Sequence, residues 1–383
     1  MDYFATPWLF RARKAMRYVR LYGVQWTYVK IAAQYHMKRR YTELPTRIRP
    51  AAKGAHVGIV GCGSFAFAMV AHYLTKHYGR VVRGCMDIDP HRAASLRDRY
   101  GASYYTTDAD ELIADPEIDL IFIASNHASH ADYAVRAMNA GKDVHIEKPH
   151  VVRPAQLDAL CTAMLASKSR VLSIGYNRTR SALGTRIREA LWSSDGELMQ
   201  NWFIAGHQLP ADHWYYSDEE GGRVLGNLCH WVEFVYHMMP PERRFPVQIT
   251  PVRSAKSDCD IAVAYTFGDG SIAALTFSAK GHAFEGVKER YAAHRGDVLV
   301  ILDDFQDLRI DRRERIFRRK PWARDHGHEA AMRRTYELSR DKSADGCSIE
   351  YVKEIGELIL QTREALETSS PRSVHASKGA GTL

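Results

Sequence analysis

The stretch "HVGIVGCGSFAFAMVAHYL", residues 56–74, decides the fold class that the sequence predicts. It begins as a short apolar run typical of a buried strand and continues as a segment of helical length. Between the two lies Gly61-Cys62-Gly63-Ser64-Phe65-Ala66, the G-x-G-x-x-G/A arrangement. The first glycine permits a tight turn, the second lets the backbone approach a pyrophosphate, and the small third residue lets helix and strand pack. We therefore expect a strand–turn–helix unit that binds a dinucleotide through Gly61, Gly63, Ser64 and Phe65.

Further apolar, β-branched runs follow, and segments of helical length separate most of them. They lie at residues 81–89, 102–107, 119–125, 143–149 and 170–176. This alternation predicts an α/β chain with a doubly wound Rossmann domain over residues 54–176. Hairpins around residues 268–270 and 295–297 predict a second α/β domain over 177–368, with an open, mainly antiparallel sheet. Residues 369–383 are expected to form a loose tail.

Composition narrows the class of protein further. The 383 residues contain six cysteines without a CxxC pair, so neither a disulfide framework nor a bound metal is expected. No run of 18 apolar residues occurs, and the first thirty residues lack the pattern of a signal peptide. A cytoplasmic location is predicted.

The positive charge is confined to the first 53 residues, which hold 12 Lys/Arg against 2 Asp/Glu and form a basic arm. The remaining chain is almost neutral, so a nucleic-acid-binding surface on it is not expected. Within residues 8–38 an amphipathic helix interrupted at Gly23 is predicted, which could lie on an anionic inner-membrane surface or dock on a neighbouring subunit. Its apolar stripe comprises Ala12, Met16, Val19, Tyr22, Trp26, Val29 and Ala33.

Two further positions concern the cofactor. Asp87 ends the strand after the glycine motif, where a carboxylate can bind the adenosine ribose and repel a 2′-phosphate, so NAD is favoured over NADP. Arg92 keeps NADP open, and Asp87 could instead begin a turn or cap the next helix. Asn126 and His127 follow the fourth strand and could either line the nicotinamide side or cap a helix.

The fifth strand ends in "DVHIEKPH", residues 143–150. Its carboxyl end also faces the ligand edge of such a sheet, which brings Lys148 beside the nicotinamide and the substrate. With Glu147 next to it, Lys148 can donate a hydrogen bond to a substrate oxygen. The alternative is a solvated Glu–Lys pair of little energetic value.

Through "GIVGCGSFA", "MDIDP", "EKP" and "EEGGRVLGNLCHWVEFVYHM", the chain resembles the Gfo/Idh/MocA family of nicotinamide-dependent sugar and inositol oxidoreductases over about residues 55–367. The resemblance implies that Lys148 and His230 flank the substrate and that the open sheet mediates a dimer or tetramer. Asn227 lies three residues before His230 and can share its pocket, and Glu233 can orient the imidazole. Where the family often has an acid, this chain has Gly226.

The stretch "GHQLPADHWYYSDEEGGR", residues 206–223, resembles the branch found with polysaccharide and nucleotide-sugar biosynthesis. That resemblance implies sugar contacts by Asp212, His213 and Trp214. The alternative is a loop anchored by one buried tryptophan. Tyr176, Asn177 and Arg178 are weaker candidates for substrate contact.

Together these features predict an NAD-dependent oxidoreductase acting on a secondary CH–OH group, or the matching ketone, of a sugar that could be nucleotide-linked. Two alternatives stay open. NAD could remain bound in a redox-neutral epimerase or eliminase, or the chain could be a non-catalytic sensor of dinucleotide or sugar.

Overall fold

The computed structural model describes residues 6–253, 260–281, 284 and 286–377. The chain divides into two compact units. One comprises Gln25–Tyr176 and His328–Val352, and is called here the Rossmann unit. The other comprises Met1–Val24, Asn177–Gly327 and Lys353–Leu383, and is called here the second unit.

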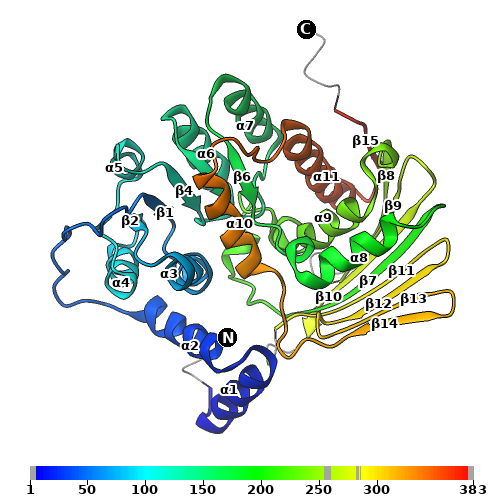
Figure 1. The fold of residues 1–383 in the computed structure, drawn as a ribbon, viewed down its shortest axis with the longest axis horizontal. Helices are drawn as coiled ribbons and strands as arrows, with labels where there is room; N and C mark the ends of the chain where they lie inside the picture. Colours follow the sequence, from blue (N-terminus) through cyan, green and yellow to red (C-terminus); the bar gives the residue numbers. More distant parts are fainter. Residues whose placement is uncertain (1–5, 254–259, 282–283, 285, 378–383) are drawn as a thin grey trace. The chain divides into compact units, whose positions relative to one another are not determined.

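The Rossmann unit is built on a six-stranded parallel sheet in the order β3-β2-β1-β4-β5-β6 (Figure 1). The chain reverses direction across the sheet between β1 and β4, and the carboxyl ends beside such a switch point are where ligands bind. The predicted doubly wound sheet is confirmed. The strands are β1 (Val57–Val60), β2 (Val82–Met86), β3 (Tyr104–Thr106), β4 (Leu120–Ile123), β5 (Asp143–Ile146) and β6 (Val171–Ile174).

Helices cover both faces of this sheet, which is why its strands are almost entirely buried. One face carries η2 (Ala66–Ala71), α3 (His72–Tyr78), α4 (Pro90–Tyr100) and α10 (His328–Arg340), and the other α5 (Ala109–Ala114), α6 (His130–Asn139) and α7 (Pro154–Ala166). Helix α10 was predicted to belong to the second domain. Its residues Ala331 and Met332 instead pack in the hydrophobic core of the Rossmann unit.

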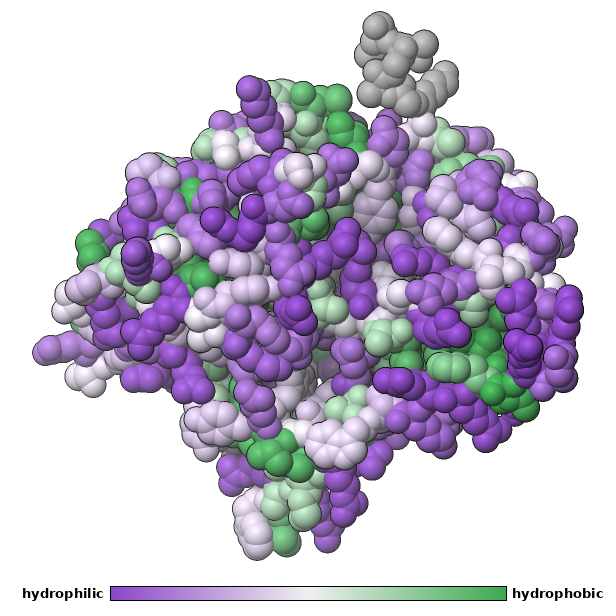
Figure 2. Space-filling model, viewed as in Figure 1, coloured by the Kyte–Doolittle hydropathy of each residue, from purple (hydrophilic) through white to green (hydrophobic). Residues whose placement is uncertain are grey.

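The arm forms two helices, α1 (Trp8–Tyr22) and α2 (Val24–Lys38), separated as predicted at Gly23. Val29 and Ala33 of α2 are buried in the hydrophobic core of the Rossmann unit, so this half of the predicted surface stripe is internal. Periodicity located the apolar face of α2 but not the surface that covers it. In α1, Met16 is exposed, and Figure 2 shows apolar residues in green on α1 at the bottom of the view.

The second unit contains a nine-stranded sheet in the order β14-β13-β12-β11-β7-β10-β9-β8-β15. Among the described strands of this sheet, only β10 and β7 pair in parallel. The two predicted hairpins are β9–β10 and β11–β12, so the mainly antiparallel sheet is confirmed. The strands are β7 (Leu198–His207), β8 (Val247–Arg253), β9 (Asp260–Thr266), β10 (Ile272–Gly281), β11 (Lys288–Arg295), β12 (Val298–Asp303), β13 (Asp307–Arg312), β14 (Arg315–Arg319) and β15 (Arg372–Val374).

Residues alternate between buried and exposed along β7, β11 and β12. The buried side faces α8 (Ala182–Trp192), α9 (Cys229–Met238) and α11 (Ile349–Thr368), whose Thr362 hydroxyl is 3.0 Å from Tyr265 Oη on β9 (Figure 1). The prediction of a loose tail over 369–383 does not hold for β15, which pairs with the edge strand β8. Residues 378–383 lie outside the described residues.

Within the described residues, no helix is long and apolar enough to cross a membrane, and no cluster of three or more His, Cys, Asp or Glu could hold a metal ion. Cys62, Cys85 and Cys229 are buried, and Cys161 and Cys347 are half-buried. Cys259 lies outside the described residues.

Candidate functional site

The glycine motif forms the turn between β1 and the helix that begins with η2. Gly61 has φ +86°, and a Cβ there would lie 2.5 Å from the Ala124 carbonyl oxygen, so only glycine fits. Apart from its two chain neighbours, no atom of the described residues lies within 4 Å of the Cβ position of Gly63, which leaves its backbone open to a ligand. Ser64 is exposed and Phe65 half-buried. The open cradle at Gly63 fits the pyrophosphate of a dinucleotide.

Asp87 directly follows β2 and lies beside this turn. Its Oδ2 accepts a hydrogen bond from the Cys62 N–H (2.7 Å), and its Oδ1 accepts one from the Asp89 N–H (2.9 Å). The cap of α4 is Asp89, which accepts from the His91 N–H, so Asp87 is not the helix cap. Ile88 is 82% exposed next to Asp87 and offers an apolar surface for an adenine ring. Sequence reasoning overlooked Ile88, although its place after Asp87 could have indicated it.

Two arginines approach this corner. Arg40 Nη1 and Arg92 Nε each lie 3.4 Å from Asp89 Oδ2. These ion pairs are partly exposed and contribute little to stability. Both cations are paired with Asp89, two residues after Asp87, and a role of Arg92 toward NADP stays a prediction.

The residues after β4 are split between surface and interior. Asn126 is exposed at the N-cap position of the turn His127–Ser129, and its Oδ1 accepts from the Ser129 hydroxyl (2.6 Å). His127 is buried, with its ring edge-on to that of His130 at 6.1 Å. Asn126 thus takes part in the local turn, and contacts of either residue with nicotinamide stay predictions.

Glu147, the first residue after β5, has a buried carboxylate. Its Oε1 accepts a hydrogen bond from His145 Nε2 (3.0 Å), and His145 Nδ1 is 3.0 Å from the Thr335 hydroxyl on α10. A Cβ at Gly175 would lie 2.2 Å from Glu147 Oε2, so glycine at this position leaves room for the carboxylate. A solvated Glu–Lys pair is therefore wrong for Glu147.

Lys148 is half-buried and follows Glu147 at the carboxyl edge of the sheet, and the Lys148–Pro149 peptide bond is cis. The Pro149 carbonyl oxygen is 2.8 Å from His130 Nδ1, and the Ser125 carbonyl oxygen is 3.1 Å from His130 Nε2. The pKa of His130 is lowered, because the effect of burial exceeds the opposing effect of the hydrogen bond to the Pro149 carbonyl. His130 therefore ties the end of β4 to the segment after β5, a contact that local sequence patterns do not reveal.

In the second unit, His230 lies on α9, which continues η6 (Val224–Leu228). Asn227 and His230 are half-buried, whereas Leu228 and Trp231 are buried. A pocket shared by Asn227 and His230 stays a prediction. Asn227 Oδ1 is buried and accepts no hydrogen bond within the described residues.

The surroundings of this stripe differ in detail from the expectation. The Glu233 carboxylate accepts from the Thr179 hydroxyl at 3.3 Å and lies 3.8 Å from His237 Nδ1. Gly226 is buried in η6. Orientation of His230 by Glu233 stays a prediction.

Arg178 and Asn177 make side-chain contacts within the second unit, and those of Arg178 reach α9. Arg178 Nε donates to Glu289 Oε2 (2.8 Å), and its guanidinium lies 4.5 Å from the Trp231 ring centroid. Trp231 Nε1 donates to the same oxygen (2.6 Å). Burial alone would raise the pKa of Glu289, but Arg178 and His326 together lower it to about 2. Asn177 is buried and donates to the His326 carbonyl (2.7 Å).

The loop before η6 carries the predicted sugar contacts. Asp212 is exposed, and Trp214 is 46% exposed, so the alternative of a buried tryptophan anchor is wrong. His213 Nδ1 accepts from the Tyr215 N–H (3.2 Å), and its ring stacks near Trp214. Exposed aromatic and carboxylate groups suit sugar binding, and that role stays a prediction. Tyr176 is buried at the end of the Rossmann unit.

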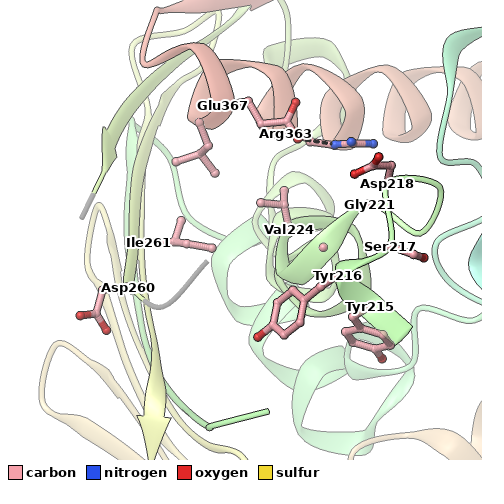
Figure 3. Close-up of a pocket in the computed structure, with 12 residues that line it drawn as sticks. Tyr215, Tyr216, Ser217, Asp218, Gly221, Val224, Asp260, Ile261, Arg363 and Glu367 are labelled. Atoms are coloured by element: carbon pink, nitrogen blue, oxygen red, sulfur yellow. Dashed lines mark hydrogen bonds and ion pairs between the residues drawn. The ribbon is translucent and has the colours of Figure 1, made fainter. Parts of the chain in front are cut away.

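A cavity of about 170 Å³ follows the same loop (Figure 3). Tyr215 and Tyr216 line its lower side in Figure 3, and Arg363, which is paired with Glu367 on α11, lines its upper side. Asp218 also lines the cavity. Sequence reasoning did not find this cavity, because α11 lies some 150 residues beyond the loop.

Residues 55–176 match the model of the Gfo/Idh/MocA oxidoreductase family, described as an NAD-binding Rossmann fold. "Oxidoreductase P35" of Formosa agariphila is 30% identical over 137 residues, covering 36% of this chain and 42% of that protein. Inositol 2-dehydrogenase of Salmonella typhimurium is 30% identical over 156 residues, covering 40% of this chain and 46% of that enzyme. The chain thus spans less than half the length of these relatives.

Solved structures show the same fold over most of the chain. Levoglucosan dehydrogenase, in complex with NADH and L-sorbose, has a TM-score of 0.71 at 15% identity and covers 84% of this chain and 99% of its own. GenD2 from gentamicin A biosynthesis, in complex with NAD, has a TM-score of 0.69 at 22% identity and covers 87% and 100%. Residues 55–176, which carry the glycine cradle and Asp87, thus match the NAD-binding Rossmann model of the Gfo/Idh/MocA oxidoreductase family.

Proposed function

We propose that this chain is an NAD-dependent oxidoreductase that acts on a secondary hydroxyl, or the matching ketone, of a sugar. The observation that carries the proposal is the carboxyl edge of the six-stranded sheet. That one edge brings together the open cradle at Gly63, the Asp87 carboxylate and the Glu147–Lys148 pair. The relatives named inositol 2-dehydrogenase and levoglucosan dehydrogenase support a sugar or polyol as substrate.

In this mechanism the bound nicotinamide supplies the hydride acceptor or donor. The Lys148 ammonium donates a hydrogen bond to the substrate oxygen and stabilises negative charge there. His230 takes the hydroxyl proton in the oxidative direction and returns it in reduction. Asn227, whose Oδ1 accepts no hydrogen bond within the described residues, holds a neighbouring substrate hydroxyl.

The test is turnover with a panel of polyols, free sugars and nucleotide sugars, followed by NADH absorbance. Reduction of NAD by at least one of them is expected. A nucleotide-linked sugar is the finer proposal, supported by Asp212, His213 and Trp214 on an exposed loop. Equal rates with the free sugar and its nucleotide-linked form argue against it.

The same panel separates the alternatives. A redox-neutral epimerase or eliminase converts substrate without release of NADH, whereas a sensor binds ligand without turnover. The Glu147 carboxylate, buried at the end of its strand, favours catalysis, since burying a charged group is costly unless its position matters.

A second copy of the chain is the proposed partner of the open sheet face. Several apolar side chains there are more than 40% exposed: Met199, Phe203, Ile272, Leu299 and Ile301. Exposed apolar side chains gathered on one sheet face are typical of an interface. Sedimentation should therefore show a dimer or tetramer, and Phe203→Asp should shift it toward the monomer.

An anionic membrane surface is the proposed partner of the first arm helix. On α1, Trp8, Leu9 and Met16 are more than half exposed, and the helix contains five Arg or Lys and no acid. Apolar side chains flanked by cations suit a lipid headgroup region. Docking on a neighbouring subunit is the competing outcome, and vesicle binding separates the two.

A further inference from the structure

His36, near the end of α2, is buried against the glycine motif within the Rossmann unit. Its Nε2 is 2.7 Å from the Cys62 carbonyl oxygen, and its Nδ1 is 2.9 Å from the Ser95 hydroxyl. Its ring stacks on Phe67, with centroids 4.3 Å apart and planes 22° from parallel. His36 is only 3% exposed, so these contacts are shielded from water.

The partners of His36 decide its tautomer. A carbonyl oxygen only accepts hydrogen bonds, so Nε2 carries the proton that points at Cys62. The Ser95 hydroxyl can then donate to Nδ1, which leaves both ring nitrogens of a neutral imidazole satisfied. Burial lowers the pKa of His36, which favours this neutral form.

Contacts of this kind hold the two peptide planes on either side of the Cys62 Cα. The Cys62 N–H is held by Asp87 Oδ2 at 2.7 Å, and the Cys62 carbonyl is held by His36. The peptide that joins Cys62 to Gly63 is planar, with its C=O and N–H pointing in opposite directions. Holding the carbonyl toward His36 therefore aims the Gly63 N–H away from His36. At Gly63 itself, no atom of the described residues other than its chain neighbours lies within 4 Å of the Cβ position.

We propose that His36 is a positioning residue of the dinucleotide site, which holds the Cys62 carbonyl so that the Gly63 N–H is aimed at the pyrophosphate. The basic arm is thereby part of the cofactor site. This inference rests on the proposed dinucleotide cofactor. It gives α2 a role in cofactor binding. The amphipathic pattern of α2 did not indicate this role, because an apolar stripe requires no histidine at position 36.

The test compares NADH affinity of the full chain and three variants, measured by fluorescence titration. His36→Phe keeps a ring on Phe67 but removes the donor, and should weaken NADH binding about tenfold, as expected for one lost hydrogen bond. His36→Gln places an amide N–H near the position of Nε2 and should stay within about threefold of the wild type. Gln34→Ala, an exposed position on the same helix, is the matched control and should bind as the wild type does.

Competition by NADH fragments separates positioning from general loosening. ADP-ribose contains the pyrophosphate and adenosine does not, so His36→Phe should weaken ADP-ribose about tenfold and leave adenosine unchanged. The melting temperature of each unloaded variant is recorded beside these affinities. Equal weakening of both fragments, or unchanged NADH affinity in His36→Phe, overturns the inference while leaving the cofactor assignment intact. Failure of the wild type to bind NADH overturns both.

Discussion

Gly175→Ala is a severe test of the packing around Lys148. An ideal Cβ at this position lies 2.2 Å from Glu147 Oε2, 2.6 Å from its Cδ and 2.8 Å from its Oε1. To make ordinary van der Waals contact with the new methyl group, the Glu147 carboxylate would have to move by about 1 Å. Because His145 Nε2 holds Oε1 at 3.0 Å, that movement strains or breaks the hydrogen bond. We expect Gly175→Ala to lower the free energy of unfolding by about 1–3 kcal/mol.

The same change should displace Lys148 and lower kcat more than it weakens NADH binding, since the glycine cradle lies elsewhere on the sheet edge. A double-mutant cycle with Glu147→Ala isolates the cause. Without the carboxylate the new methyl group has room, so Gly175→Ala should then cost under about 0.5 kcal/mol, as do most substitutions without a clash. Urea unfolding of the four proteins measures the coupling. An equal cost of Gly175→Ala in both backgrounds would refute the assigned clash.

Three further results are expected. Asp87→Ser should narrow the preference for NAD over NADP, because it removes the carboxylate that repels a 2′-phosphate. Fluorescence titration with both cofactors measures this preference. A wild type that binds NADP as tightly as NAD refutes the prediction. Glu289, whose pKa is lowered from 4.5 to about 2, stabilises the fold above about pH 4.5 and loses that contribution as pH falls toward 2. Thermal unfolding of Glu289→Gln should therefore show a smaller loss of stability than the wild type over this range, and parallel curves contradict it. Replacing Trp8, Leu9 and Met16 together by serine should reduce cosedimentation with anionic vesicles. The melting temperature should not fall, because all three side chains are exposed. Identical partitioning of the variant and the wild type onto the vesicles removes the membrane proposal.

Sequence patterns predicted those parts of the fold that short-range spacing determines. Gly61 and Gly63 after an apolar run indicated the first turn of the Rossmann sheet, and alternation around residues 268–270 indicated a hairpin. The contact of His36 with Cys62 spans 26 residues, and that of His145 with Thr335 spans 190. Such pairs depend on which surfaces pack together. The hydrophobic period of a helix or strand shows that one face is covered, but not which element covers it. For the same reason the pattern of α2 showed an apolar face but not that the Rossmann core covers it.

The candidate site was predictable to a similar extent. Glycine, acid and lysine positions follow from the strand ends of a parallel sheet, so the places of Gly63, Asp87 and Lys148 after β1, β2 and β5 were predictable, while their roles stay proposals. The exposure of Trp214 and the burial of Asn177 were not, because loop conformation depends on contacts such as the bond from Asn177 to the His326 carbonyl, 149 residues away.

The most direct test of the proposed function is steady-state turnover of Lys148→Ala and His230→Ala, with NADH affinity measured on the same proteins. If Lys148 stabilises the substrate oxygen and His230 moves its proton, each substitution should lower kcat about a hundredfold or more. NADH affinity should change far less, and the double variant should be little worse than the poorer single one, since the two residues act on one oxygen. Turnover near that of the wild type in both single variants would remove these residues from the mechanism.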